Sequence, residues 1–213
     1  MGWTVVVPVR GGGRGKSRLP ASVGGVGRRR WVLAFAADTI AAVRRSPAVE
    51  RVVVALSEPF PELTGLVGAD EDAAPVSFHL DAEPRGLNAS ILAAIAGLDH
   101  SLFAVLPADL PCLAASDVTD LLRAADSAGR VVVADAEGRG SVALASGSGP
   151  LAPRFGDGSF AAHVAEGYHP TEGTERLRRD VDTLADLLDA VALGVGDATS
   201  ALAREAGLLP EPS

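Results

Sequence analysis

Lys16 is the only lysine of the chain and stands in a glycine-rich segment after a run of β-forming residues, Trp3 to Val9. Arg10, Arg14 and Arg18 surround it, so cations alternate with glycines. Glycine lets the backbone approach a ligand closely and expose successive N–H groups to an anion. The segment therefore predicts a site for the phosphates of a nucleoside triphosphate. The residues predicted to form this site are Arg10, Gly11, Gly15 and Lys16.

Two other interpretations of this segment are weaker. A plain strand-to-helix turn rarely needs four glycines interleaved with four cations. A P-loop, G-x-x-x-x-G-K-[ST], would end in Gly15-Lys16-Ser17, but its first position is Arg10 and not glycine. A P-loop also begins its helix at the lysine, and Pro20 would fall in or just after the first turn, where it lacks a needed N–H.

Three aspartates are candidates for holding a metal ion. Asp109 follows the predicted strand 102–107, and ligands of open α/β sheets bind beyond the carboxyl ends of the strands. Asp180 and Asp182 flank Val181, and in an extended segment alternate side chains face the same side. Three carboxylates would suit Mg²⁺, which prefers carboxylates, water and substrate phosphates. The structural alternative is that these residues are a turn aspartate and a helix cap.

Further polar positions could contact the substrates. Gly86 would let the backbone approach a flat base or ribose, and the Asn88 amide could read its polar edges. Ser141 opens a predicted strand, and Ser159 begins a short helical pattern; both hydroxyls could donate to a carboxylate or phosphate. Each of these signals is weak by itself, because glycine close to asparagine or serine is common in turns.

Short Val-rich runs alternate with Ala- and Leu-rich helical stretches, which predicts βα units and a mostly parallel sheet covered on both faces. The chain of 213 residues is expected to be one domain over residues 1–209, with 210–213 a flexible tail. Predicted helices include 28–45, 88–98 capped by Asn88, one to about Ala125 capped by Ser116 or Asp117, and 184–193 capped by Asp182 or Thr183. The predicted strands are 4–9, 51–56, 76–80, 102–107, 130–134 and 141–146.

Composition excludes several classes of function. The net charge of −8 argues against nonspecific nucleic-acid binding and against an anionic membrane surface. Cys112 is the single cysteine, which excludes a disulfide framework and suits a reducing cytoplasm. The four histidines show no metal-ligand spacing. Neither a membrane-spanning run nor a signal peptide is expected.

Taken in order, these segments resemble the 2-phospho-L-lactate and phosphoenolpyruvate guanylyltransferases of coenzyme F420 biosynthesis, within the MobA-like nucleotidyltransferase-A superfamily. The resemblance extends over about residues 4–200. The segments that carry it are Pro8-Val9-Arg10 with Gly15-Lys16-Ser17-Arg18-Leu19, Gly86-Leu87-Asn88, Pro107-Ala108-Asp109-Leu110-Pro111, Arg154-Phe155-Gly156 with Ser159, and Asp180-Val181-Asp182-Thr183.

The resemblance implies a single Rossmann-like α/β domain that transfers GMP from GTP to phosphoenolpyruvate or 2-phospho-L-lactate and releases pyrophosphate. It implies Mg²⁺ held by Asp109, Asp180 and Asp182. A phosphate oxygen of the acid would attack the α-phosphorus, with Lys16, Arg18 and Asp109 as the catalytic residues. The residues that it implies for the acid are Ser141, Gly156 and Ser159.

Other assignments stay open from the sequence. A molybdenum-cofactor or sugar-phosphate nucleotidyltransferase would share the first motif, and a catalytically silent nucleotide-binding regulator would share the fold. A homodimer and handover of an unstable product to the next transferase of the pathway are further expectations.

Overall fold

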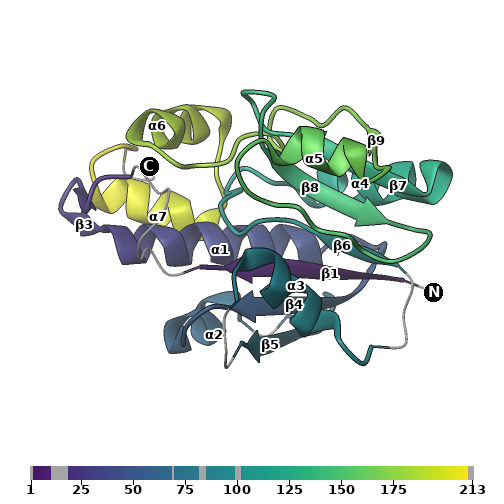
Figure 1. The fold of residues 1–213 in the computed structure, drawn as a ribbon. Helices are drawn as coiled ribbons and strands as arrows, with labels where there is room; N and C mark the ends of the chain where they lie inside the picture. Colours follow the sequence, from purple (N-terminus) through teal and green to yellow (C-terminus); the bar gives the residue numbers. More distant parts are fainter. Residues whose placement is uncertain (1, 11–18, 69, 82–84, 99–101, 211–213) are drawn as a thin grey trace.

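The computed structural model describes residues 2–10, 19–68, 70–81, 85–98 and 102–210. A seven-stranded sheet in the order β5-β4-β1-β6-β8-β7-β9 forms its centre (Figure 1). Among the described strands of this sheet, β8 alone runs antiparallel to its neighbours, so the predicted mostly parallel sheet is confirmed. The strands are β1 Trp3–Val9, β4 Val49–Leu56, β5 Val76–Leu80, β6 Phe103–Val105, β7 Arg130–Ala134, β8 Ser141–Ser146 and β9 His169–Pro170; a separate hairpin joins β2 Ser22–Val23 to β3 Val26–Gly27.

The central strands are buried on both faces, which explains their continuous Val-rich composition. Every residue of β1 is buried, and its apolar side chains belong to two clusters on opposite faces of the sheet. Val5 and Val7 pack with residues of α1 (Arg28–Arg44), whereas Val6 packs with residues of α3 (Leu87–Ile95). The strand is therefore held by apolar packing from both sides of the sheet.

Helices cover both faces of the sheet and one end of it (Figure 1). One face carries α1 together with α2 (Pro61–Val67) and α4 (Ala115–Ala128), whose Leu63, Val118 and Leu121 join the same cluster. The other face carries α3 and α5 (Ser159–Ala165). The remaining helices, α6 (Leu184–Leu193) and α7 (Asp197–Glu205), pack through Leu187 and Ala203 around Trp31 at the beginning of α1.

The helix starts correct two sequence expectations. Asn88 does not cap α3, because the helix begins at Leu87 after Gly86 and the Asn88 side chain binds a distant backbone. Neither Ser116 nor Asp117 is the cap of α4; its first residue is Ala115, and Asp117 accepts a hydrogen bond from the Ala114 N–H from inside the first turn. Within the described ranges, no helix is both long and apolar enough to cross a membrane.

The segments that follow β1 and β6 and the start of β8 lie at the same edge of the sheet. Val6 of β1 is paired with Val105 of β6. Arg10 and Asp109 come equally far after this pair along the chain, so both follow their strands at the same edge of the sheet. Because β8 is antiparallel to β6 and β7, its first residue, Ser141, lies at this edge too, paired with Ala134. Ligands of open α/β sheets bind at such an edge.

Candidate active site

The structure brings the three predicted aspartates together. The segment around Val181 docks on the end of β6, where the Val181 N–H donates to the carbonyl oxygen of Asp109 at 3.0 Å. Val181 itself is buried, so Asp180 and Asp182 turn to the other side of this extended segment. Carboxylates from two distant parts of the chain therefore share one small volume at the edge of the sheet.

The pKa values of these carboxyl groups reflect how close the groups lie to one another. Burial raises the pKa of Asp109, the charge of Asp182 raises it further, and Arg10 partly opposes the shift. Burial also raises the pKa of Asp180, with contributions from Asp109, Asp135 and Asp182. Negative charge that is both desolvated and repelled is stabilised by a cation.

One carboxylate oxygen of these aspartates is not satisfied by a hydrogen bond within the described residues. Oδ1 of Asp109 is enclosed and has no hydrogen-bond partner among the residues that the structure describes. A buried acceptor without a partner costs free energy, commonly about 1–3 kcal/mol. The orphaned oxygen and the mutual repulsion both fit a hard divalent cation at this place.

The described residues do not form a complete metal cage. Among them, no group of three or more His, Cys, Asp or Glu side chains has the arrangement needed to hold a metal ion. Mg²⁺ is usually bound by one or two carboxylates that share it with waters and substrate phosphates. Asp109 with one partner from the 180–182 segment is therefore a sufficient protein contribution.

The N-cap of α6 excludes the helix-cap alternative for Asp182. Thr183 is the N-cap of α6: its hydroxyl accepts the Asp186 N–H at 3.2 Å, and the Asp186 carboxylate accepts the Thr183 N–H at 2.7 Å. This reciprocal pair is a capping box. The cap expected at Asp182 or Thr183 is thus Thr183, and α6 does not use the Asp182 side chain as its cap.

Asp135 is a member of the acidic cluster that the sequence reasoning missed. It comes directly after β7, and its charge contributes to the raised pKa of Asp180. Its carboxylate accepts the N–H groups of Arg139 and Gly140 at 2.9 and 2.7 Å, which shapes the turn into β8. An aspartate directly after a predicted strand was the signal that could have found it.

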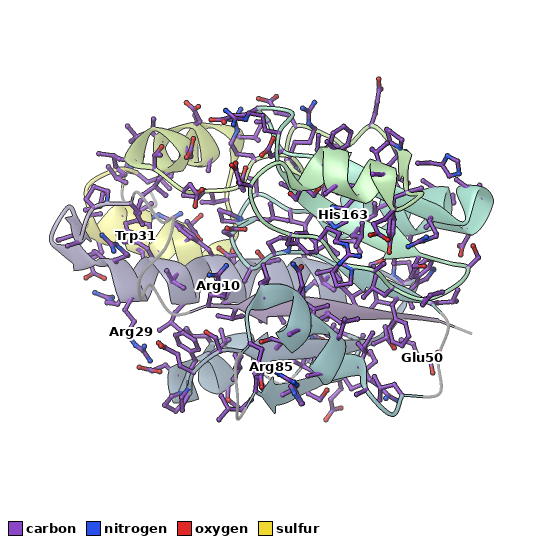
Figure 2. All side chains as sticks on the ribbon, in the orientation of Figure 1. Arg10, Arg29, Trp31, Glu50, Arg85 and His163 are labelled. Carbon is purple, nitrogen blue, oxygen red and sulfur yellow. The ribbon has the colours of Figure 1, made fainter. Side chains whose placement is uncertain are left out.

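The predicted phosphate site lies largely outside the described residues. This applies to Gly11, Gly15, Lys16 and Arg18, whereas Arg10 is described and exposed at the end of β1 (Figure 2). Arg10 is close enough to Asp109 for its charge to lower the pKa of that carboxyl group.

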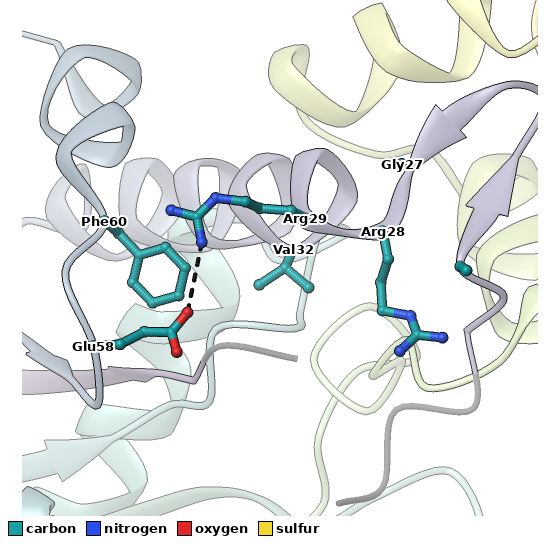
Figure 3. A pocket seen from close by; sticks show the side chains of 7 residues that line it. Gly27, Arg28, Arg29, Val32, Glu58 and Phe60 are labelled. Atoms are coloured by element: carbon teal, nitrogen blue, oxygen red, sulfur yellow. Dashed lines mark ion pairs between the residues drawn. The ribbon is translucent and has the colours of Figure 1, made fainter. Parts of the chain in front are cut away.

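On the other side of β1, an open pocket of about 460 Å³ lies between the start of α1 and the segment after β4 (Figure 3). Arg29 lies over the ring of Phe60 and forms an ion pair with Glu58 at 3.5 Å. Because β1 lies between β4 and β6, the pocket and the three aspartates lie on opposite sides of the end of β1.

The residues expected to bind the acid also come together. Ser141 is buried at the start of β8, and Ser159 is buried at the start of α5. The N–H of Phe160 donates to the Arg139 carbonyl at 3.2 Å, which ties α5 to the turn before β8. Gly156 has φ +146°, which side chains rarely allow, and an added Cβ would meet nothing within 4 Å. Its backbone is therefore open to a ligand.

Asn88 and Gly86, expected at the nucleotide, are placed differently from each other. The Asn88 amide accepts the Phe155 N–H at 2.8 Å and donates to the Phe155 carbonyl at 3.1 Å. Asn88 therefore joins α3 to the loop that carries Gly156. Gly86 precedes α3 with φ +101° and open space beside it. The space beside Gly86 would allow the close approach of a base or ribose that the sequence predicts.

The fold and this edge define a class of protein. The MobA-like NTP transferase domain matches residues 23–157. Among solved structures, a protein from Desulfovibrio desulfuricans described as a nucleotide-diphospho-sugar transferase superimposes with a TM-score of 0.65 at 14% identity, covering 98% of this chain and 97% of that one. A 4-diphosphocytidyl-2C-methyl-D-erythritol synthase from Anaerococcus prevotii gives a TM-score of 0.58 at 14% identity over 90% and 95%. The chain is a MobA-like NTP transferase.

Curated relatives identify a narrower family within the MobA-like NTP transferases. A phosphoenolpyruvate guanylyltransferase of Streptomyces avermitilis is 39% identical over 100% of this chain and 98% of its own length. Phosphoenolpyruvate guanylyltransferases of Thermomonospora curvata and Streptomyces coelicolor are each 38% identical, over 94% and 95% of this chain and 88% and 96% of their own lengths. The chain belongs to the phosphoenolpyruvate guanylyltransferase family.

Proposed function

We propose that this protein transfers GMP from GTP to phosphoenolpyruvate and releases pyrophosphate. Its relatives carry that activity in their names, and the end of β6 carries the acidic cluster that such a reaction needs. The observation that supports the proposal most directly is the docking of residues 180–182 on Asp109, beside Arg10. The resemblance in sequence adds the expectation that the product serves coenzyme F420 biosynthesis.

The reaction joins two anions, so positioning and charge neutralisation are its main requirements. A phosphate oxygen of phosphoenolpyruvate attacks the α-phosphorus of GTP; a new P–O bond forms, and the bond to the β-phosphate oxygen breaks. The second pKa of a phosphomonoester is about 6, so the nucleophile is mostly dianionic at neutral pH. No general base is needed.

Each residue then has a defined task. Asp109 with Asp180 or Asp182 would hold Mg²⁺, which when bound supplies positive charge to the phosphates of both substrates. Arg10, Lys16 and Arg18 bind the β- and γ-phosphates and stabilise the departing pyrophosphate, with the backbone at Gly11 and Gly15 in close approach. Gly86 faces the nucleoside, and Asn88 fixes the loop around Gly156. The hydroxyls of Ser141 and Ser159 donate to the acid.

A grid of nucleotides against acceptors tests the proposal. Purified protein is mixed with Mg²⁺, one nucleotide (GTP or ATP) and one acceptor (phosphoenolpyruvate, 2-phospho-L-lactate, a sugar 1-phosphate or molybdopterin), and pyrophosphate is measured. We expect release with GTP and phosphoenolpyruvate. Release only with a sugar phosphate or molybdopterin would assign a different nucleotidyltransferase, and no release with any pair would favour a nucleotide-binding regulator.

A further inference from the structure

His163 has no part in the reaction described above, yet its ring joins two parts of the acceptor region. It lies on α5, fully buried between this helix and the sheet (Figure 2). Its Nδ1 is 2.9 Å from the hydroxyl oxygen of Ser141, and its Nε2 is 2.8 Å from the backbone nitrogen of Arg154. The first partner opens β8, and the second lies two residues before Gly156.

These two contacts decide the tautomer of the ring. A backbone N–H can only donate, so Nε2 must be the acceptor of the Arg154 N–H and carries no hydrogen. In the neutral ring the hydrogen is then on Nδ1, which donates to the Ser141 hydroxyl oxygen. Burial lowers the pKa of His163 to about 4, and the Ser159 backbone opposes this only in part, so the ring is neutral at pH 7.

The direction of this hydrogen bond changes what Ser141 can do. A hydroxyl that accepts from Nδ1–H keeps its own hydrogen for another acceptor. If the ring were reversed, Ser141 would donate to the histidine and lose that capacity. The tautomer therefore prepares the serine as a donor to an oxygen of a bound anion.

The loop before α5 is fixed by the same group of side chains. Tyr168 accepts the Ala152 N–H at 2.9 Å, next to the Arg154 contact with the histidine and the Phe155 contact with Asn88. The rings of Phe155 and Tyr168 pack edge-on against His163, with centroids 5.0 and 5.8 Å away. A ring held on both sides by aromatic neighbours keeps a defined orientation.

We propose that His163 is a positioning residue of the acceptor site: its Nδ1–H makes the Ser141 hydroxyl a donor to the phosphorylated acid, and its Nε2 fixes the loop that carries Gly156. This inference rests on the proposed function, because the acceptor is the ligand that Ser141 would bind. His163 does not touch the reacting atoms; it acts through Ser141 and Arg154.

Two substitutions separate the two ends of the ring. His163→Gln keeps an oxygen near the position of Nε2 for the Arg154 N–H but offers no donor to Ser141. His163→Asn places an amide N–H near the position of Nδ1 and loses the contact with Arg154. Because a hydrogen bond contributes about 1 kcal/mol, we expect the KM for phosphoenolpyruvate to rise about five- to tenfold in His163→Gln, with the KM for GTP changed less than about twofold.

Two controls show whether the effect passes through Ser141. In a Ser141→Ala background, adding His163→Gln should change the KM for phosphoenolpyruvate no further, because the shared contact is already lost. Tyr168→Phe removes another contact to the same loop without touching Ser141, and it should leave the acceptor KM closer to wild type than His163→Gln does.

The ring state is measured separately by ¹⁵N NMR of the histidine in the wild-type protein, which should show hydrogen on Nδ1 and none on Nε2. Hydrogen on Nε2, or additive effects of Ser141→Ala and His163→Gln, would overturn the positioning role. A wild-type protein that makes pyrophosphate with no acceptor would instead contradict the proposed function, whatever the tautomer. The two failures are therefore distinguishable.

Discussion

The N–H of Val181 donates to the carbonyl oxygen of Asp109 across a gap of 72 residues in sequence, at 3.0 Å. This bond, together with the buried Val181 side chain, fixes the position of the 180–182 segment relative to the end of β6. The backbone thus sets the distance between carboxylates that repel each other. Such repulsion is tolerated in a folded protein when a ligand benefits from it.

Asp109→Asn should lower turnover by at least about 10²-fold while leaving stability unchanged or improved without divalent ions, because a desolvated and repelled charge is removed. Adding MgCl₂ should raise the Tm of the wild type, since an ion that binds the native state stabilises it, and should raise that of the variant less. Steady-state kinetics and thermal melts with and without MgCl₂ are the measurements.

Asp120→Asn is the matched control, because Asp120 is an exposed residue of α4 that forms an ion pair with Arg123 on the same helix. It should behave as wild type in both measurements. If Asp109→Asn retained near-normal turnover at saturating Mg²⁺, the assignment of Asp109 to the metal would be wrong.

Thr183→Ala and Asp182→Asn should affect different quantities. Loss of the cap removes two hydrogen bonds at the start of α6 and should lower the free energy of unfolding by about 1 kcal/mol, with little change in kcat. Asp182→Asn should lower kcat strongly and stability little, because α6 is not capped by that side chain. Urea unfolding and pyrophosphate release distinguish them; the reverse pattern would make Asp182 structural.

Lys16→Ala should lower kcat/KM by about 10²-fold, the usual cost of losing one preorganised charge contact in an active site. The effect should appear for GTP with any acceptor, because the lysine is assigned to the nucleotide phosphates. Lys16→Arg keeps the charge and is the matched comparison. A change below about threefold in Lys16→Ala would remove this residue from the site.

The sheet and most helices could be predicted from the sequence because their signals are local. Val-rich runs predicted five strands nearly to their ends, and the predicted helix 184–193 has the bounds of α6. The antiparallel direction of β8 could not be read from its composition, since a strand buried on both faces looks alike in either direction. The two-residue β9 is too short to give a periodic signal.

The site was predictable where a residue follows a strand and not where it acts through a distant partner. Asp109 was found from its place after a strand, whereas Asn88 was assigned to a helix cap because its partner, Phe155, is 67 residues away. His163 gave no signal for the same reason: its contacts to Ser141 and Arg154 exist only in the folded chain.

Asn88→Ala should weaken use of the acceptor more than use of the nucleotide. The substitution removes both hydrogen bonds that hold the Phe155 backbone and frees the loop around Gly156. We expect the KM for phosphoenolpyruvate to rise about thirtyfold, since two bonds of about 1 kcal/mol each are lost. Kinetics with each substrate varied in turn make the comparison; a rise confined to the KM for GTP would show that Asn88 reads the nucleotide.

The stability of the protein should depend on pH through His163. Its folded-state pKa is about 4, whereas that of an unfolded histidine is about 6.5, so the unfolded chain binds more protons between these values. The contribution is complete above about pH 6.5 and is lost as the pH falls toward 4. Of the nearby charges, Arg154 lowers the pKa and Glu166 raises it, and these two side chains pair with each other.

From pH 7 to pH 5, His163 should cost the wild type about 2 kcal/mol of unfolding free energy, as follows from its shift by linkage. Urea unfolding at both pH values measures the loss in the wild type, in His163→Gln and in His169→Gln, which removes an exposed imidazole instead. His163→Gln should lose about 2 kcal/mol less than the wild type between the two pH values, and His169→Gln should follow the wild type. Equal losses in all three proteins would mean that His163 accepts a proton in the folded state as readily as in the unfolded chain.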